Sequence, residues 1–214
     1  MPATAGSIPN ASPVDDGEGR QQRAIDTRRS ILNHAALLFA SSGYDGCSTR
    51  DIAAAAKVSH ANIRYHFGDK ETLWRSVIEF LISEEYEANE LLTQLDTSDT
   101  PTEIFRQHTR NAISAVAKRP QLQRILHLER LLGNSRFADV ETIARDIDEE
   151  RVGHIEMMQR AGTVNPDVDP AFLNEFIAGG LLQRFVLEPI EDDDERERMV
   201  DAFTDLVVRL VQTP

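Results

Sequence analysis

Large polar side chains crowd one short segment of this chain, between Ser59 and Phe67. If the segment is helical, Ile63 and Phe67 face inward together with Ala61, and the remaining residues point outward. The outward side chains combine cationic, aromatic and hydrogen-bonding groups: His60, Asn62, Arg64, Tyr65 and His66. A surface helix with these groups suits the major groove of DNA, where the base edges present donors and acceptors.

Two preceding blocks are expected to position that segment. The first has an apolar face with helical spacing and ends at Gly43, where a left-handed residue is favoured; this face comprises Ile31, Ala35, Leu38 and Phe39. The second begins after Ser48, and Asp51 completes a capping box. Only two residues then separate it from Ser59, the cap of the third block. A connection this short predicts a helix-turn-helix.

The run STRDIAAAAKVSHANIRYHFGDKETL resembles the DNA-binding domain of the TetR/AcrR family of bacterial transcriptional repressors. The resemblance implies base-edge contacts from Arg50, His60 and Arg64. It also implies contacts that mainly hold phosphates, from Thr49, Asn62, Tyr65, His66 and Lys70. In the alternative interpretation, Tyr65 is a packing residue and His66 is simply exposed to solvent.

This sequence departs from the family pattern at two positions. Arg64 stands where the family usually has tyrosine, which adds a bidentate guanine reader or a further phosphate contact. Lys57 stands where the turn usually has glycine. A lysine that keeps a positive φ there costs about 1 kcal/mol.

Charge is distributed unevenly along the 214 residues, whose formal net charge is −13. Residues 20–75 hold nine Lys/Arg against five Asp/Glu, whereas residues 76–214 hold fourteen against twenty-eight. The acidic remainder is expected to confine DNA contact to one face. The single cysteine excludes an internal disulfide framework and fits the reducing cytoplasm. No stretch reaches the ~18–20 apolar residues of a membrane span.

We expect an all-α protein in three parts. Residues 1–22 lack the basic start and apolar run of a signal peptide and are expected to form a disordered arm. Residues 23–70 would form the DNA-binding domain, and residues 71–214 a helical ligand-binding and dimerisation domain. A helix over 70–95 should end at the LDTSDTP segment. Further helix starts and stops are expected at Thr100 with Glu103, Pro120, Gly133, Gly162, Asp169 and Pro189.

Two C-terminal helices carry more apolar surface than a small monomer needs. Residues 172–186 are apolar on more than one side, and the last helix keeps a stripe formed by Met199, Phe203, Leu206, Val207 and Leu210. The family resemblance implies a homodimer in which these helices form a four-helix bundle. A helix-turn-helix protein that binds a palindromic DNA site also requires a second subunit related by two-fold symmetry. The candidate interface comprises Phe172, Gly179, Gly180, Leu182, Phe203, Leu206 and Leu210. The alternative is that both faces are buried in a monomer.

The resemblance also implies an effector pocket among the middle helices. The candidate contacts are His108, Asn111, His127, Arg130, His154, Met158 and Phe176, each of which could instead be an ordinary core or surface residue. Their mixture favours a modest-sized, largely apolar effector.

No enzymatic motif is present: there is no GxSxG, no glycine-rich phosphate loop, no HExxH and no ExxH pair. We therefore expect no catalytic residue, no cofactor and no metal. The expected function is a ligand-responsive repressor that binds a palindromic operator as a homodimer. Two alternatives are a constitutive DNA-binding regulator without an effector and a redox sensor that acts through Cys47, next to the Ser48 cap.

Overall fold

The computed structural model describes residues 16–92, 100–133, 137–188 and 190–211, and every regular element within them is helical. This confirms the all-α prediction. The elements in chain order are α1 Asp16–Ser42, α2 Thr49–Ala55, α3 His60–Phe67, α4 Lys70–Leu92, α5 Pro101–Lys118, α6 Gln121–Leu132, α7 Phe137–Arg160, α8 Pro170–Leu181, the π-helix η1 Leu182–Leu187, and α9 Asp193–Val211.

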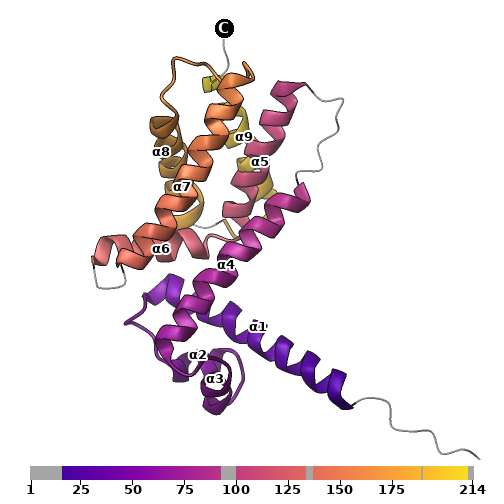
Figure 1. The fold of residues 1–214 in the computed structure, drawn as a ribbon, viewed down its shortest axis with the longest axis vertical. Coiled ribbons are helices and arrows are strands. Elements are labelled where there is room, and N and C mark those ends of the chain that lie inside the picture. Colours follow the sequence, from indigo (N-terminus) through magenta and orange to yellow (C-terminus); the bar gives the residue numbers. More distant parts are fainter. Residues whose placement is uncertain (1–15, 93–99, 134–136, 189, 212–214) are drawn as a thin grey trace, which may run out of the picture.

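The helices form two parts that α4 connects (Figure 1). The first three helices make a head at one end, α5 to α9 make a helical domain at the other, and α4 runs from the head into that domain. Helix α1 packs against α4 and α6, whereas α5 packs mainly against α9. None of the described helices is long and apolar enough to cross a membrane.

The core of the head extends beyond the head's own three helices. Ile31 and Phe39 of α1 are buried with Ile52 and Ile63 of the next two helices. The same cluster contains residues of α4 and α6: Leu73, Trp74, Val77, Ile78, Leu81, Leu122, Ile125 and Leu126. The predicted domain boundary between residues 70 and 71 therefore lies within a shared hydrophobic core. Through this core the head packs against α6 as well as α4.

Local caps define the helix-turn-helix. The Ser48 side chain accepts a hydrogen bond from the Asp51 backbone N–H, and the Asp51 carboxylate accepts one from the Ser48 backbone N–H at 2.8 Å. The Ser59 hydroxyl accepts a hydrogen bond from the backbone N–H of Asn62. The predicted capping box and the predicted cap of the third block are therefore confirmed. Lys57 has φ 55°, so the lysine does occupy the left-handed turn position.

Ala61 was expected to face inward, and this is wrong, because the residue is exposed. Positions two apart on a helix point to nearly opposite sides, so Ala61 cannot share the face of Ile63. Close crossing of α2 and α3 relies instead on Ala53 and Ala56, which are buried in α2.

Helix α1 begins at Asp16, earlier than predicted. Residues 16–22 are helical, so this part of the expected disordered arm is corrected; residues 1–15 lie outside the described residues. The correction has a physical reason, because Arg20 to Arg23 are good helix formers and follow two glycines that each cost only about 1 kcal/mol. The first turns of α1 extend away from the body of the head (Figure 1), and residues 19–23 are exposed.

In the helical domain, the Thr100–Glu103 capping box is confirmed, and Gly133 ends α6 in the left-handed conformation with φ 57°. Most of the LDTSDTP breaker and Pro189 lie outside the described residues. Helix α8 was expected to continue regularly toward Pro189, but it changes at Leu182 into the π-helix η1.

Helices α8 and α9 cross closely at Gly180. A Cβ atom at Gly180 would lie 2.7 Å from Cζ of Phe203, so a larger residue there would displace that ring. Of the predicted Gly179-Gly180 pair, Gly180 alone contacts the neighbouring helix. Gly179 itself has no atom within 4 Å of its would-be Cβ and faces outward.

Candidate functional site

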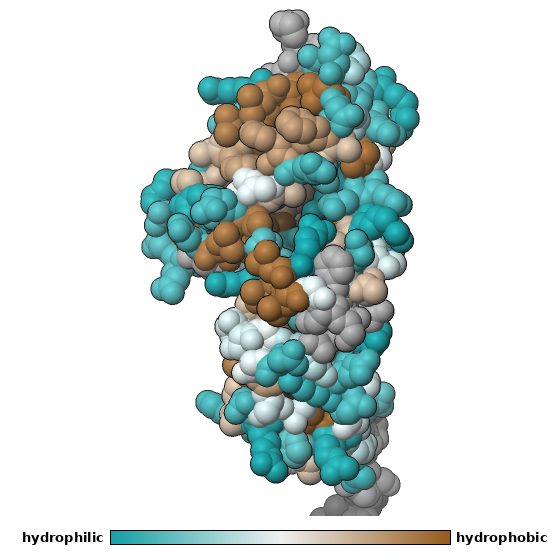
Figure 2. All heavy atoms as spheres, turned by 90° about the vertical axis from the view of Figure 1, so that its left-hand side faces the viewer, coloured by the Kyte–Doolittle hydropathy of each residue, from teal (hydrophilic) through white to brown (hydrophobic). Residues whose placement is uncertain are grey.

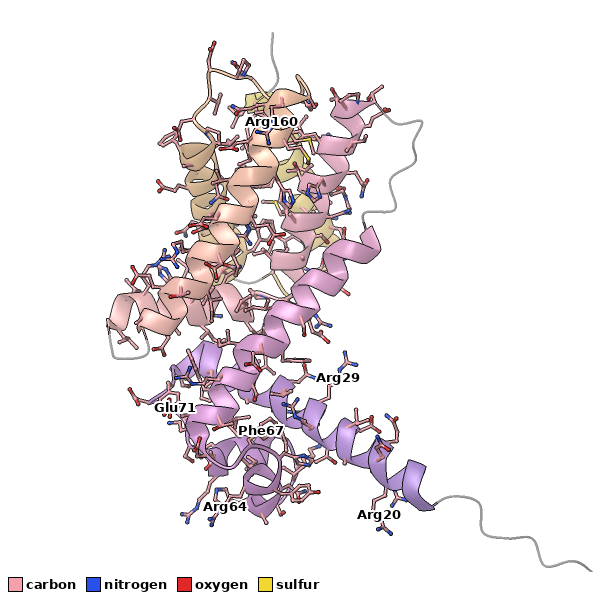
Figure 3. All side chains as sticks on the ribbon, in the orientation of Figure 1. Arg20, Arg29, Arg64, Phe67, Glu71 and Arg160 are labelled. Atoms are coloured by element: carbon pink, nitrogen blue, oxygen red, sulfur yellow. The ribbon has the colours of Figure 1, made fainter. Side chains whose placement is uncertain are left out.

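The outer face of α3 and the start of α2 carry the residues predicted to contact DNA. Arg50, Arg64 and Tyr65 are exposed, and Tyr65 keeps 83% of its surface accessible. The high exposure of Tyr65 argues against the packing interpretation. Figure 3 shows Arg64 extending outward from the end of the head that lies farthest from the helical domain. Two side chains able to make bidentate contacts thus project from adjacent helices.

His60 and Thr49 join the two helices of the motif. Thr49 Oγ1 lies 3.0 Å from His60 Nε2, so one of the two donates a hydrogen bond according to the imidazole tautomer. The contact orients the His60 ring at the beginning of α3. Asn62, two residues further along α3, is half-buried.

The side chains of Lys70 and His66 also contact or lie near other residues of the head, so they are not free to serve phosphate alone. Nζ of Lys70 lies 4.2 Å from the centre of the Tyr44 ring, a cation–π contact that holds the ammonium group at the start of α4. Burial lowers the pKa of the His66 imidazole, and the nearby Arg28 guanidinium lowers it further. A neutral His66 can therefore donate one hydrogen bond to a phosphate but adds no positive charge at neutral pH.

Two adjoining cavities lie among α5, α6, α7, α8 and η1. The larger has a volume of about 280 Å³ and includes His127 and Arg130 in its wall. The smaller has a volume of about 130 Å³ and includes His108, His154 and Met158. The His108 and His154 rings meet edge to face, with their centres 5.1 Å apart. Five of the predicted effector contacts are therefore gathered around these two spaces.

Asn111 and Phe176, the other two predicted contacts, line neither of these cavities. Asn111 is only 3% exposed and accepts a 2.8 Å hydrogen bond from Gln107 Nε2 within α5. Phe176 is 54% exposed and follows Phe172 by one turn on the outer side of α8. Apolar character alone could not distinguish an inward from an outward phenylalanine on a helix that is apolar on several sides.

Several polar residues of the cavity walls were not predicted. Gln123 of α6, Asp148 and Arg151 of α7, and Asn174 of α8 all line the larger cavity. Asn174 Nδ2 donates a 3.1 Å hydrogen bond to Asp148 Oδ1. The sequence could have indicated Gln123, because Gln123, His127 and Arg130 follow the i, i+4, i+7 spacing of one helix face.

The outer sides of α8 and α9 keep apolar residues exposed. Phe172 is 66% exposed, Leu206 50% and Leu210 54%, whereas Val207 and Val208 on the other side of α9 are buried. Of the remaining predicted interface residues, Gly179 is exposed, but Gly180, Leu182 and Phe203 are partly buried within the subunit. Figure 2 shows hydrophobic side chains gathered over the helical domain and sparse on the head.

Cys47 is buried, and its Sγ lies 3.7 Å from the Gly43 carbonyl oxygen. Burial raises the pKa of the thiol, which outweighs the opposing effect of Lys70. A reactive sensor cysteine needs an accessible thiolate, so this environment counts against the redox alternative.

The fold and the outward α3 face define a helix-turn-helix protein with a helical second domain. Residues 31–77 match the family model for bacterial regulatory proteins of the tetR family. The HTH-type transcriptional repressor NicS of Pseudomonas putida is 32% identical over 112 residues, which cover 52% of this chain and 52% of that protein. The chain thus spans about half the length of that relative. The HTH-type transcriptional repressor KstR2 of Rhodococcus jostii is 24% identical over 166 residues, 77% of this chain and 79% of the relative.

The same architecture occurs among solved structures. The ketosteroid transcriptional regulator KstR2 of Mycobacterium tuberculosis superposes with a TM-score of 0.69 at 18% identity, covering 87% of this chain and 95% of that one. Together, these findings identify residues 31–77 as a tetR-family DNA-binding segment, and they support a TetR family transcriptional regulator. The proteins named here are all described as regulators, in keeping with the expectation from a sequence without an enzymatic motif.

Proposed function

We propose that the protein is a ligand-responsive transcriptional repressor that binds a palindromic operator in the cytoplasm as a homodimer. The observation that carries the proposal is the outward face of α3, where Arg64 and Tyr65 are exposed at the far end of the head with Arg50 beside them on α2. Two similar proteins, from Pseudomonas putida and Rhodococcus jostii, are named as transcriptional repressors. Phosphate contacts from Thr49, Asn62 and Lys70 would fix the head on the duplex while Arg50 and Arg64 read base edges.

Homodimer formation is supported by the exposed apolar residues of α8 and α9. Phe172, Phe176, Leu206 and Leu210 are each at least half exposed. Large apolar side chains gathered on a surface mark an interaction site. Packing against the same helices of a second copy would bury it, and the two-fold symmetry would place the α3 helices in successive major grooves about 34–36 Å apart.

The effector site would be the pair of cavities between α5 and α8. The cavities adjoin helices that contact α4, since both α5 and α6 pack on it. An effector that separates α5, α6 and α7 would therefore shift α4 and the head that α4 carries. The coupling expected between two such sites is about 1–3 kcal/mol.

Genome-wide mapping of the sites that the protein occupies, followed by binding of the recovered DNA to the purified protein, tests this function. We expect an imperfect inverted repeat, bound by a dimer. Binding without sequence preference, or occupancy of no specific sites, would contradict it. A constitutive regulator remains the alternative, and it predicts specific operator binding that no cavity ligand weakens.

A further inference from the structure

The two cavities are adjacent and share part of their lining. Both include Val116 of α5, Arg151 of α7 and three residues of α8: Asn174, Ala178 and Leu181. Their volumes are about 280 Å³ and about 130 Å³. The five shared residues place the two spaces side by side, and a ligand that occupied both would pass along them.

The smaller cavity is the apolar end. Its wall includes Phe105, Met158, Leu173 and Ile177, and burial lowers the pKa of the His108 imidazole that lies among them. Near neutral pH that ring therefore carries no charge to attract an ion. An apolar protein cavity of roughly 150 Å³ accommodates benzene. The smaller cavity is thus sized for an apolar group of about one ring or for a short alkyl chain.

The larger cavity is the hydrogen-bonding end, and α6 supplies its donors. Gln123, His127 and Arg130 lie on one face of this helix and line the cavity. The Nε2 atom of Gln123 is buried and has no hydrogen-bond partner among the described residues. A buried donor without an acceptor is unfavourable, so a ligand acceptor that reaches this atom would stabilise the occupied cavity.

The acceptor across the cavity is already engaged. Asp148 Oδ1 accepts the hydrogen bond from Asn174 Nδ2 at 3.1 Å and lies 4.0 Å from Arg151 Nη1. Glu175, the other carboxylate in the wall, is exposed. Gln123 Nε2 is thus the unmatched buried group of this end among the described residues, and the wall also holds one exposed cation, Arg130, and the exposed Glu175.

We propose that the effector is a small monocarboxylate with an apolar body of about one ring or a short alkyl chain. Its carboxylate accepts hydrogen bonds from Gln123 and Arg130 in the larger cavity, and its apolar body enters the smaller cavity beside Met158. This inference rests on the proposed function, and it adds the chemical class of the ligand to it.

Calorimetric titration of the full-length protein tests the ligand class with three molecules of nearly equal shape: phenylacetate, phenylacetamide and 2-phenylethylamine. Hexanoate and octanoate serve as alkyl acids. We expect at least one acid to bind, and phenylacetate to bind at least about tenfold more tightly than its amide or amine, as a charge-assisted hydrogen bond provides. Tighter binding of the amide or the amine would overturn the proposal, and so would failure of all three acids to bind at millimolar concentration.

Gln123→Glu tests the site, because it exchanges the donor for an acceptor of the same shape. We expect it to weaken phenylacetate by about tenfold or more and to remove the preference for the acid over the amine. Gln183→Glu is the matched control, since Gln183 is exposed and lines neither cavity. Equal acid affinity in Gln123→Glu and the native protein would overturn the assignment.

Met158→Trp tests the apolar end independently, because the larger side chain fills the smaller cavity. It should weaken all phenyl ligands together while their order is kept, with thermal unfolding used to check that the variant folds. Operator binding is measured on the same preparations. Loss of operator binding by the native protein would refute the proposed function, whereas intact operator binding without acid selectivity would refute only the ligand class.

Discussion

Arg29 on α1 and Glu84 on α4 form an ion pair, with Arg29 Nη2 2.6 Å from Glu84 Oε1. The other Glu84 oxygen pairs with Arg119, the residue that ends α5. The Glu84 side chain is only 9% exposed, although both arginines are mostly accessible. One carboxylate thus connects the head, the helix that carries the head, and the helical domain.

We expect Glu84→Gln to lower the free energy of unfolding by about 1–3 kcal/mol, because a largely buried acceptor of two charged donors is lost. Glu71→Gln on the same helix is the control. It breaks the Arg75–Glu71 pair, whose side chains are 51% and 60% exposed, and an exposed pair contributes at most about 1 kcal/mol. Urea unfolding followed by circular dichroism compares the two variants. Equal losses would mean that the Glu84 contacts add no more than a surface pair.

The features that the sequence could predict are those determined within a few residues. The capping boxes at Ser48 and Thr100 depend on side chains three positions away. The positive φ of Lys57 was suggested by the glycine that the resembled family usually has at this turn position. Contacts such as Glu84 with Arg119 depend on how α4 and α5 cross. No local pattern specifies that crossing.

The cavity residues divide in the same way. His108 and His154 were predicted as polar residues in apolar surroundings, and the structure brings their rings together. The outward position of Phe176 was not predictable, because α8 is apolar on several sides, so its inward face depends on where α5, α7 and α9 pack. Gln123 was overlooked because a lone glutamine is ordinary on a helix until its neighbours are known to bury it.

Arg64→Ala is expected to weaken specific operator binding by about 1–3 kcal/mol and to relax preference at particular base pairs, since its side chain is exposed on α3. Arg50→Ala should act similarly at other positions. Lys70→Ala should weaken all sequences alike and reduce the salt slope by about one unit per site. Fluorescence anisotropy over a set of operator variants and salt concentrations distinguishes these effects. If Arg64→Ala changes only the salt slope, Arg64 contacts phosphate and reads no base.

Leu206→Glu is expected to prevent dimer formation without unfolding the subunit. Leu206 is 50% exposed in the single chain, but burial against a second copy would place an uncompensated charge in the interface at a cost of several kcal/mol. Leu37→Glu is the control, because Leu37 is 54% exposed on α1, outside the proposed interface. Sedimentation equilibrium should find a dimer for the native protein and Leu37→Glu, and a monomer for Leu206→Glu. A native monomer at micromolar concentration would rule out the homodimer.

His108 should make stability depend on pH. Burial lowers its folded-state pKa, His154 adds to this and Glu150 opposes it, while Arg151 lines the same cavity. The unfolded chain then binds the proton more readily, so the contribution of His108 is complete above the unfolded pKa of about 6.5 and is lost as the pH falls below it. We expect His108→Leu to lose less stability than the native protein between about pH 7.5 and about pH 5.5. Parallel pH profiles from urea unfolding would contradict this.

Trp74, the single tryptophan of the chain, should report induction without a label. Its side chain is 1% exposed, the Tyr44 ring lies edge-on at 6.3 Å, and Leu122 and Ile125 of α6 belong to the same core cluster. An effector that moves α6 relative to α4 would therefore change the surroundings of the indole. We expect its emission to shift as the ligand saturates.

Operator affinity should fall in the same titration by about five- to 150-fold, which corresponds to a coupling of about 1–3 kcal/mol. Linkage requires that saturating operator DNA weakens the ligand by the same factor, so both directions are measured. Phenylacetate and octanoate are the first ligands to titrate, with the Gln123→Glu variant as the control that should shift emission only at higher ligand concentration. A ligand that saturates the cavities and shifts Trp74 emission, yet leaves operator affinity unchanged, is not an inducer. If every cavity ligand behaves in this way, the protein is a constitutive regulator.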